Sequence, residues 1–420
     1  MNSPTSQTAG LYIHIPFCVR KCPYCDFNSY ATEHKNSTFV EVAKQYVDSL
    51  ITEFNHYCDD TQKAGHGEWQ AVIFDTVFLG GGTPSLLPGE ELARLLTTLK
   101  ASGQISTEAE ISIEANPGTI DEALGQEKLR EVFAAGYNRI SFGSQSFSPR
   151  KLQVLGRIHV PEDTYRAVDY ARAAGFTNLN LDLMYGVKDE TTAELNYDLE
   201  QLFSLNPSHI SAYCLTIEPG TEFGNLRQRG VDMTSGEDFQ GESYLETLAT
   251  LEAHGYKQYE VSNYAKPGQA CRHNLGYWSG KAYLGLGAGA ASYLPSLAPW
   301  KAASADTVVA KRWVNLPGPA HYVSSIHNSG QARQTTDSVA RERAIREFLF
   351  LRLRRAAGIT ATEFAADFGE PFPLPLEQAF KRLISDALIA QTGPQLRLTP
   401  RGFLFSNSVF EQLVEAIPGS

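Results

Sequence analysis

Three cysteines near the amino terminus, Cys18, Cys22 and Cys25, are close enough in sequence to bind one metal centre together. Thiolate sulfur is a preferred ligand of iron–sulfur clusters and of zinc. A structural zinc site usually has a fourth Cys or His at related spacing, and none lies between Asp26 and Tyr30. The spacing therefore favours a 4Fe-4S cluster with three protein ligands and one open iron, with a structural zinc site as the alternative.

Two other groups of residues have types that suit a polar ligand. The glycine-rich turn Gly80–Thr83 lets backbone groups approach a ligand without interference from Cβ atoms. On its own it is equally well an ordinary strand-to-helix turn. Glu114 is placed to accept hydrogen bonds from hydroxyl groups, although an isolated carboxylate at a strand end is more often simply solvated.

These residues follow apolar segments that predict parallel strands separated by helices. The predicted strands are Leu11–Ile15, Phe74–Leu79, Glu110–Ala115, Arg139–Phe142, Asn178–Met184 and His209–Thr216. The predicted helices are Thr38–Phe54, Glu90–Leu99, Gln126–Ala135, Pro161–Ala174 and Ala193–Leu205. This order indicates an α/β fold, either a partial barrel or an open doubly wound sheet, with its functional loops at the carboxyl ends of the strands. The cysteines, the glycine turn and Glu114 all fall there.

The pattern changes after about residue 220. We expect a helix at Asp238–Ala253 and a strand at Tyr256–Val261, then a glycine- and aromatic-rich stretch from Gly276 to Tyr293. The last region has two predicted helices and a strand pair, which suggests a small winged-helix-like domain: Arg341–Arg355, Leu376–Asp386 and Leu388–Leu398. We predict four segments, namely a polar tail at 1–10, a barrel at 11–220, an extension at 221–334 and a C-terminal domain at 335–420.

Composition limits the class of protein. With 420 residues, 42% of them hydrophobic and 20% charged, the chain is typical of a folded soluble protein. A net charge of -11 argues against nucleic-acid binding. Met1–Gly10 lacks the features of a secretory signal, and no apolar run reaches the roughly 18–20 residues of a membrane helix. Three of six cysteines within eight residues indicate a metal site in a reducing cytoplasm.

The segment Tyr12–Cys18 with the three-cysteine spacing, followed by the GGGTP turn, resembles the radical S-adenosylmethionine (SAM) superfamily. Within it, the chain is similar to oxygen-independent coproporphyrinogen III oxidases and their relatives. The resemblance implies a partial (β/α)6 barrel and a 4Fe-4S cluster whose open iron is chelated by SAM. It also implies SAM contacts from nine residues, Tyr12, Tyr24, Gly81, Gly82, Thr83, Glu114, Gln145, Arg157 and Asp182. Without the resemblance, Arg157 is equally well a surface side chain.

Two features separate the oxidases from their relatives. The oxidases carry a further cysteine two residues after the third cluster ligand, where this chain has Phe27, and they have a long N-terminal extension where only ten residues precede Leu11. The segment His273–Trp278 has the HNxxYW pattern of HemW-type heme chaperones, formed by His273, Asn274, Tyr277 and Trp278. An imidazole can ligate heme iron, and Tyr and Trp offer flat apolar faces. Taken alone, the group is more often a packed core cluster.

The resemblance therefore predicts a heme chaperone that holds a 4Fe-4S cluster, SAM and heme and passes heme to acceptor proteins such as respiratory cytochromes. The alternative is an oxidase that cleaves SAM reductively and decarboxylates coproporphyrinogen III. Nearby Cys271 is interpreted as a buried thiol, with heme ligation as the alternative. The sequence leaves open whether the protein is a monomer or a homodimer, and whether it associates peripherally with a membrane.

Overall fold

The computed structural model describes residues 8–33, 36–58, 69, 72–120, 124–296 and 304–417 of the chain. Six parallel strands form its centre and are neighbours in chain order: β1 (Thr8–Ile15), β4 (Ile73–Gly81), β5 (Ile105–Ala115), β6 (Arg139–Gln145), β7 (Asn178–Tyr185) and β8 (His209–Cys214). In a doubly wound sheet the strand order reverses at a central strand. The six strands here follow one another in chain order without such a reversal. The sequential order confirms the partial barrel. The polar tail predicted at 1–10 lies outside the described residues up to residue 7, and residues 8–10 begin β1.

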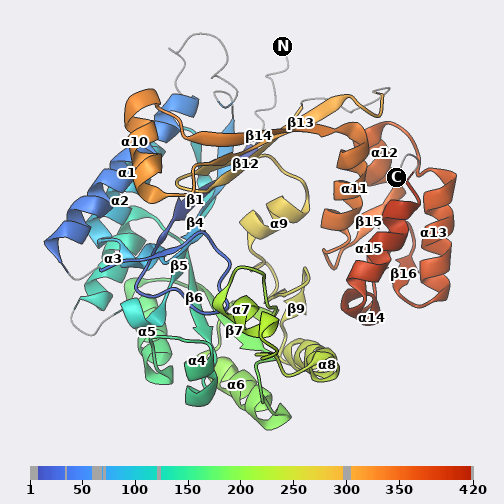
Figure 1. Cartoon of the computed structure of the whole chain (residues 1–420), viewed down its shortest axis with the longest axis horizontal. Helices are drawn as coiled ribbons and strands as arrows, with labels where there is room; N and C mark the ends of the chain where they lie inside the picture. Colours follow the sequence, from blue (N-terminus) through green and yellow to red (C-terminus); the bar gives the residue numbers. More distant parts are fainter. Residues whose placement is uncertain are drawn as a thin grey trace.

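Helices between the strands cover the outside of the sheet (Figure 1). They are α1 (Ser37–Cys58), α2 (Gly89–Ala101), α3 (Gly125–Ala135), α4 (Pro149–Val154), α5 (Pro161–Ala174) and α6 (Thr192–Leu205). Local signals set their ends: Thr191 and Glu194 form a capping box at the start of α6, and α5 ends at Gly175, whose φ of 113° suits a residue without Cβ. The five predicted helices are present, and α4 is an additional one.

The open barrel is extended at both edges. At the β1 edge, β11 (Tyr283–Leu286) pairs parallel with β1, and β12 (Ala291–Pro295), β13 (Val308–Asn315) and β14 (Arg333–Ala340) continue antiparallel. At the β8 edge lie β10 (Asn263–Ala265) and β9 (Lys257–Gln258). The strand predicted at 256–261 is therefore shorter than expected, because after Gln258 the chain turns back and returns as β10, which pairs antiparallel with β9.

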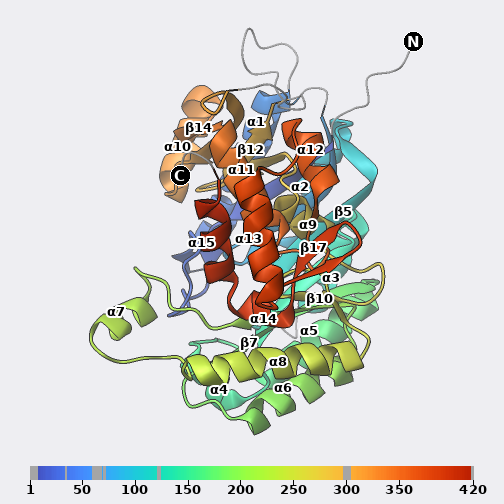
Figure 2. The ribbon, with the colours of Figure 1, turned by 90° about the vertical axis from the view of Figure 1, so that its right-hand side faces the viewer.

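The C-terminal residues form a separate group of helices with a three-stranded sheet, which faces the viewer in Figure 2. Its helices are α11 (Arg341–Arg352), α12 (Ala361–Phe368), α13 (Leu374–Ser385), α14 (Pro400–Leu404) and α15 (Ser406–Glu415), and its strands are β15 (Ile359–Thr360), β16 (Ile389–Thr392) and β17 (Gln395–Leu398). Helices combined with this small sheet confirm the winged-helix-like prediction. Its core is rich in phenylalanine, including Phe348, Phe364 and Phe372.

Helix α9 (Arg272–Trp278), which carries the HNxxYW residues, lies between the barrel and the C-terminal domain and contacts β1, β4 and α11 (Figure 1). The Glu110 carboxylate at β5 fixes its first turn by accepting hydrogen bonds from the backbone N–H groups of Arg272 (3.1 Å) and His273 (3.2 Å). A carboxylate at this end is favourable because the first N–H groups of a helix have no partner within it. The connecting helices α7 (Glu222–Gln228), α8 (Glu237–Ala253) and α10 (Pro319–Ser329) complete the fold. In the described parts of the chain, no helix combines the length and apolar character needed to cross a bilayer.

Candidate functional site

The three cysteines lie on a loop that is closed at its base by two short parallel strands, β2 (Phe17–Cys18) and β3 (Tyr30–Ala31). The loop is anchored to distant parts of the fold through Asn28. Its side-chain Nδ2 donates to the backbone carbonyls of Ala288 and Pro317, both at 2.9 Å. The backbone carbonyl of Asn28 contacts His14 Nε2 at 2.8 Å. The cysteine loop is therefore held as part of the barrel.

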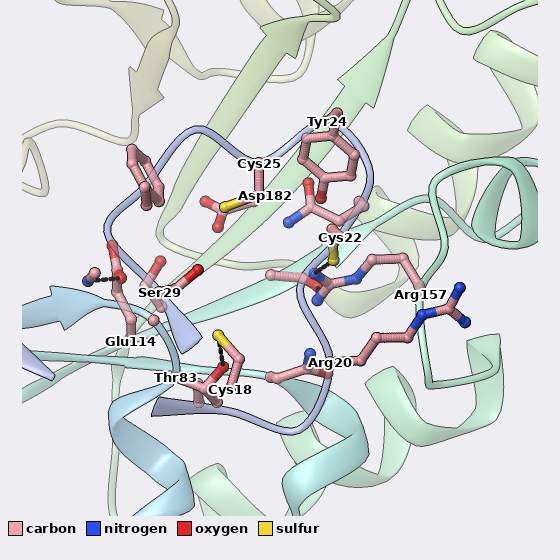
Figure 3. Close-up of a pocket in the computed structure, with 18 of the residues that line it drawn as sticks. Cys18, Arg20, Cys22, Tyr24, Cys25, Ser29, Thr83, Glu114, Arg157 and Asp182 are labelled. Atoms are coloured by element: carbon pink, nitrogen blue, oxygen red, sulfur yellow. Dashed lines mark hydrogen bonds between the residues drawn. The ribbon is translucent and has the colours of Figure 1, made fainter. Parts of the chain in front are cut away.

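A cavity of about 290 Å³ opens inside this loop at the carboxyl ends of the strands (Figure 3). Of the predicted cluster and SAM residues, eleven line it: Cys18, Cys22, Cys25, Tyr24, Gly81, Gly82, Thr83, Glu114, Gln145, Arg157 and Asp182. Tyr12 does not belong to this lining. Its hydroxyl contacts His14 Nδ1 at 2.9 Å, so it connects to the cysteine loop through His14 and Asn28.

The cysteines have the chemistry of a cluster site. All three are free thiols, and burial raises the pKa of Cys18 and of Cys25, so both stay protonated until a metal displaces the proton. A hydrogen bond from Thr83 Oγ1, which lies 3.5 Å from Cys18 Sγ, acts against this shift. Within the described ranges, no three His, Cys, Asp or Glu side chains are placed to hold a single metal ion. Three thiolates that each take a different iron atom of a cluster need no such convergence.

The glycine turn has little N–H capacity left for a ligand. The N–H of Gly81 donates to Glu114 Oε2 (3.1 Å), that of Gly82 to the Ile15 carbonyl (2.8 Å) and that of Thr83 to the Phe17 carbonyl (2.8 Å). A Cβ on Gly82 would lie 2.7 Å from both of those carbonyl oxygens, which explains the glycine. The N–H groups of the turn are therefore taken by Glu114, the end of β1 and the base of the cysteine loop, and what the turn can present to a ligand is its carbonyl side.

Two carboxylates, Glu114 and Asp182, line the same cavity (Figure 3). Burial, and secondly the charge of Asp182, raise the pKa of Glu114 to about 7. Burial also raises the pKa of Asp182, against the hydrogen bond that Asn180 Nδ2 donates to its Oδ1 at 2.7 Å. A positive charge beside these two buried carboxylates would favour their ionised forms, so the cavity suits a ligand that carries positive charge.

Arg157 is a buried cation that lines the cavity, and the surface position considered from the sequence is wrong. Its Nη1 lies 3.5 Å from Cys22 Sγ and its Nη2 donates to the Gly143 carbonyl at 2.7 Å. It also hydrogen-bonds to Tyr24, whose pKa is raised by burial and lowered by the arginine. The guanidinium therefore faces Cys22 on one side and the Gly143 carbonyl on the other.

Gln145 has a left-handed backbone conformation, with φ of 63°, which is uncommon outside glycine and common at functional sites. The residues after it are fixed by a buried ion cluster. Asp198 accepts hydrogen bonds from Ser146 and from the Phe147 N–H (2.6 Å), and Lys151 Nζ contacts both Asp198 (2.8 Å) and Glu190. The side chains of Lys151, Glu190 and Asp198 are fully buried. This cluster holds Gln145 at the cavity.

The HNxxYW residues lie on α9, between the barrel strands and α11, and do not line this cavity. His273 is 4% exposed, its Nδ1 contacts Thr76 Oγ1 at 2.8 Å and its Nε2 contacts the Tyr277 hydroxyl at 3.0 Å. Burial, then the charges of Lys281 and Arg139, lower the pKa of His273 to about 3, so the ring is neutral. Both ring nitrogens are thus occupied, as in the packed-cluster interpretation of the motif.

The other motif residues face the surrounding elements. Trp278 hydrogen-bonds to Glu260, and the Asn274 side chain hydrogen-bonds to Tyr259. Cys271 is 1% exposed, and burial raises its pKa to about 12, in keeping with the buried-thiol interpretation.

Several lining residues were not predicted from the sequence: Arg20, Phe27, Ser29, Asn116, Ser141, Gly143, Met184 and Tyr213. Phe27, at the position where the oxidases have a cysteine, is 63% exposed at this cavity. The period-two alternation of strand β8 offered a signal for Tyr213, since Ser211 and Tyr213 point to one face and Ala212 to the other.

The partial barrel and the cysteine loop define a protein of the radical SAM class, and the model of the radical SAM superfamily matches residues 12–202. The model of the HemN C-terminal domain matches residues 339–405. The chain is 35% identical over 403 residues to the heme chaperone HemW of Bacillus subtilis, covering 95% of this chain and 97% of that protein. It is 43% identical over 282 residues to the heme chaperone HemW of Escherichia coli, covering 67% of this chain and 69% of that protein. The chain belongs to the HemW family.

A similar structure is that of coproporphyrinogen III oxidase (HemN) from Escherichia coli, which is described as a radical SAM enzyme. The TM-score is 0.76 at 22% sequence identity, and the match covers 99% of this chain and 90% of that chain. This likeness supports the fold. Membership in the radical SAM superfamily implies a 4Fe-4S cluster and SAM.

Proposed function

We propose that this protein is a heme chaperone, which binds heme at α9 and delivers it to acceptor heme proteins such as respiratory cytochromes. The observation that carries the proposal is the HNxxYW helix, packed against β1 and β4 of the barrel in a chain that aligns over 95% of its length with a HemW heme chaperone. The exposed Phe27, where the oxidases have a cysteine, supports the same conclusion.

In this proposal Cys18, Cys22 and Cys25 ligate the 4Fe-4S cluster, and SAM fills the rest of the cavity. SAM has a positively charged sulfonium and ammonium and one carboxylate, so it meets the preference of the cavity for a cation. Glu114 and Asp182 would accept hydrogen bonds from its hydroxyl or ammonium groups, and the carbonyl side of the glycine turn would accept from the ammonium. When bound, the cluster supplies one-electron chemistry, while the chain orients the ligand and excludes water.

Heme binding at α9 requires a change in the hydrogen bonds of His273. Its Nε2 must leave Tyr277, or its Nδ1 must leave Thr76, before the ring can ligate iron. The neutral state of the ring favours ligation, because a protonated nitrogen has no lone pair to donate.

The test is an anaerobic preparation of the full chain, assayed for iron and sulfide and then titrated with heme. We expect the double variant His273→Ala, Trp278→Ala to bind heme at least about tenfold more weakly, about 1.4 kcal/mol. His327→Ala, at an exposed histidine of α10, controls for adventitious imidazole binding. A double variant that binds heme as tightly as wild type would remove the motif from the proposal. Transfer of heme from the loaded protein to an apo-cytochrome tests delivery.

An oxidase remains the second candidate because eleven of the twelve predicted cluster and SAM residues line the cavity. The same preparation, given coproporphyrinogen III, SAM and a reductant without oxygen, separates the two. Decarboxylated product with release of 5′-deoxyadenosine would support the oxidase and count against a pure chaperone. A colourless preparation with zinc and no iron would overturn the cluster assignment.

A further inference from the structure

A chain of hydrogen bonds runs through the barrel from the cavity to α9. Asn180 Nδ2 donates to Asp182 Oδ1 at 2.7 Å, and Asn180 Oδ1 lies 2.6 Å from His209 Nδ1. His209 Nε2 lies 2.8 Å from the Tyr259 hydroxyl, which is hydrogen-bonded in turn to the side chain of Asn274 on α9. Asn180 is 2% exposed and His209 1%, so water has little access to the centre of this chain.

The direction of every proton in the chain follows from the Asp182 carboxylate. The two hydrogens of Asn180 Nδ2 go to Asp182 and to Ser141 Oγ (2.7 Å), so Asn180 Oδ1 must accept, and His209 Nδ1 must carry the hydrogen it accepts. Burial lowers the pKa of His209 far below its usual value, so the ring is neutral and its Nε2 accepts from the Tyr259 hydroxyl. The Tyr259 oxygen then accepts from the Asn274 amide. Such a chain has one arrangement and loses it when one member is withdrawn.

Helix α9 is also bound to the C-terminal domain. Trp278 donates to Glu260, the neighbour of Tyr259, and the Arg354 guanidinium lies over the Trp278 ring at 5.6 Å from its centroid. Just after α9, the carbonyl of Ser279 accepts from Arg352 at 3.2 Å. Movement of α9 thus disturbs the hydrogen-bond chain on one side and the C-terminal domain on the other.

We propose that His209 and Tyr259 are positioning residues that couple the cofactor cavity to α9, so that SAM at Asp182 and heme at α9 weaken each other's binding. The inference rests on the proposed function. Heme can reach His273 only if α9 moves, because the ring is only 4% exposed beneath the helix and its Nδ1 is held by Thr76 of β4. That movement withdraws Asn274 from Tyr259. Asp182 then loses the orientation that a ligand in the cavity needs, and a ligand held by Asp182 resists the same movement.

The test measures the dissociation constant of SAM anaerobically on the cluster-loaded full chain, with and without saturating heme, and that of heme with and without SAM. In wild type we expect each ligand to raise the Kd of the other by at least about fivefold, and by the same factor in both directions. Tyr259→Phe, which can neither donate to His209 nor accept from Asn274, should bring this factor close to one. This factor is the ratio of two dissociation constants measured on the same variant, so a general loss of stability does not change it.

Tyr256→Phe is the matched control, since Tyr256 is buried three positions away and its hydroxyl donates to the Pro207 carbonyl (2.8 Å) outside the chain. It should keep the wild-type factor. Should Tyr259→Phe not fold, His209→Gln, which retains a donor and an acceptor, should keep part of the coupling that His209→Leu abolishes. Independent binding of the two ligands in wild type, or an unchanged factor in Tyr259→Phe, overturns the inference. If wild type binds SAM but no heme, the proposed function itself fails and this inference falls with it.

Discussion

Glu53 of α1 is fully buried between distant parts of the fold, and its replacement by glutamine should change how stability depends on pH. Its Oε2 accepts from the Gly287 N–H (2.9 Å) and the Tyr322 hydroxyl (2.7 Å), and its Oε1 accepts from Asn315 Nδ2 (2.7 Å). Despite these donors, burial raises the pKa of Glu53 from 4.5 to about 7. Between these two values the folded chain holds a proton that the unfolded chain has lost.

Protonated Glu53 therefore contributes stability that is fully present below pH 4.5 and is lost as the pH rises through about 7. A pKa moved from 4.5 to about 7 in the folded state corresponds to roughly 3 kcal/mol. Glutamine carries no charge at any pH, so this loss should be absent in Glu53→Gln. At roughly 2 °C per kcal/mol for a chain of this size, the Tm of wild type should fall by about 6 °C more than that of the variant between about pH 5 and 8.

The assay is a thermal melt of cluster-free, reduced protein over that pH range. Glu377→Gln, at an exposed position on α13, is the matched control and should follow the wild-type curve. Parallel pH curves for wild type and Glu53→Gln would refute the reasoning, because they would mean that Glu53 is ionised in the folded chain over the whole range.

Three further changes test the cofactor site. Gly82→Ala places a Cβ 2.7 Å from the carbonyl oxygens of Ile15 and Phe17, which lead into the cysteine loop. The purified variant should therefore retain less iron and sulfide per chain than wild type while keeping its far-UV circular dichroism. Lys151→Met leaves the two buried carboxylates beside it without a cation and should lower the free energy of unfolding by about 3–5 kcal/mol, measured by urea denaturation of the apoprotein. Arg157→Leu removes a positive charge and a hydrogen bond beside Cys22, so the reduction potential of the cluster should become more negative. Redox titration measures this potential. An unchanged potential would mean that the arginine does not interact with the cluster.

Local sequence patterns predicted the barrel well because its parts are locally determined. The buried strands are near-continuous apolar runs, and the intervening helices have their own caps, such as Thr191 and Glu194 at α6. The carboxyl ends of parallel strands lie on one side of a sheet, so placing the cysteines, Glu114 and Asp182 at strand ends was enough to bring them to one cavity.

The surroundings of the HNxxYW residues could not be predicted in this way. His273 meets Thr76 across 197 positions of sequence, and Tyr12, expected at the cavity, contacts His14 instead. Strand β11 lies in a glycine-rich stretch whose propensity for strand is low, and pairing with β1 overrides that propensity. The left-handed backbone of Gln145 likewise depends on a buried ion cluster contributed by later segments, and no local signal marks it.

The anchoring of the cysteine loop sets an order of events during synthesis. The loop is synthesised well before its anchor, because the carbonyls that hold Asn28 belong to residues 260 and 289 positions further along. At typical rates of elongation, roughly 15–60 s separate the two. The thiols therefore spend this interval without the contacts that anchor their loop, and a cluster that needs the anchored loop would enter it only after Pro317 has been made.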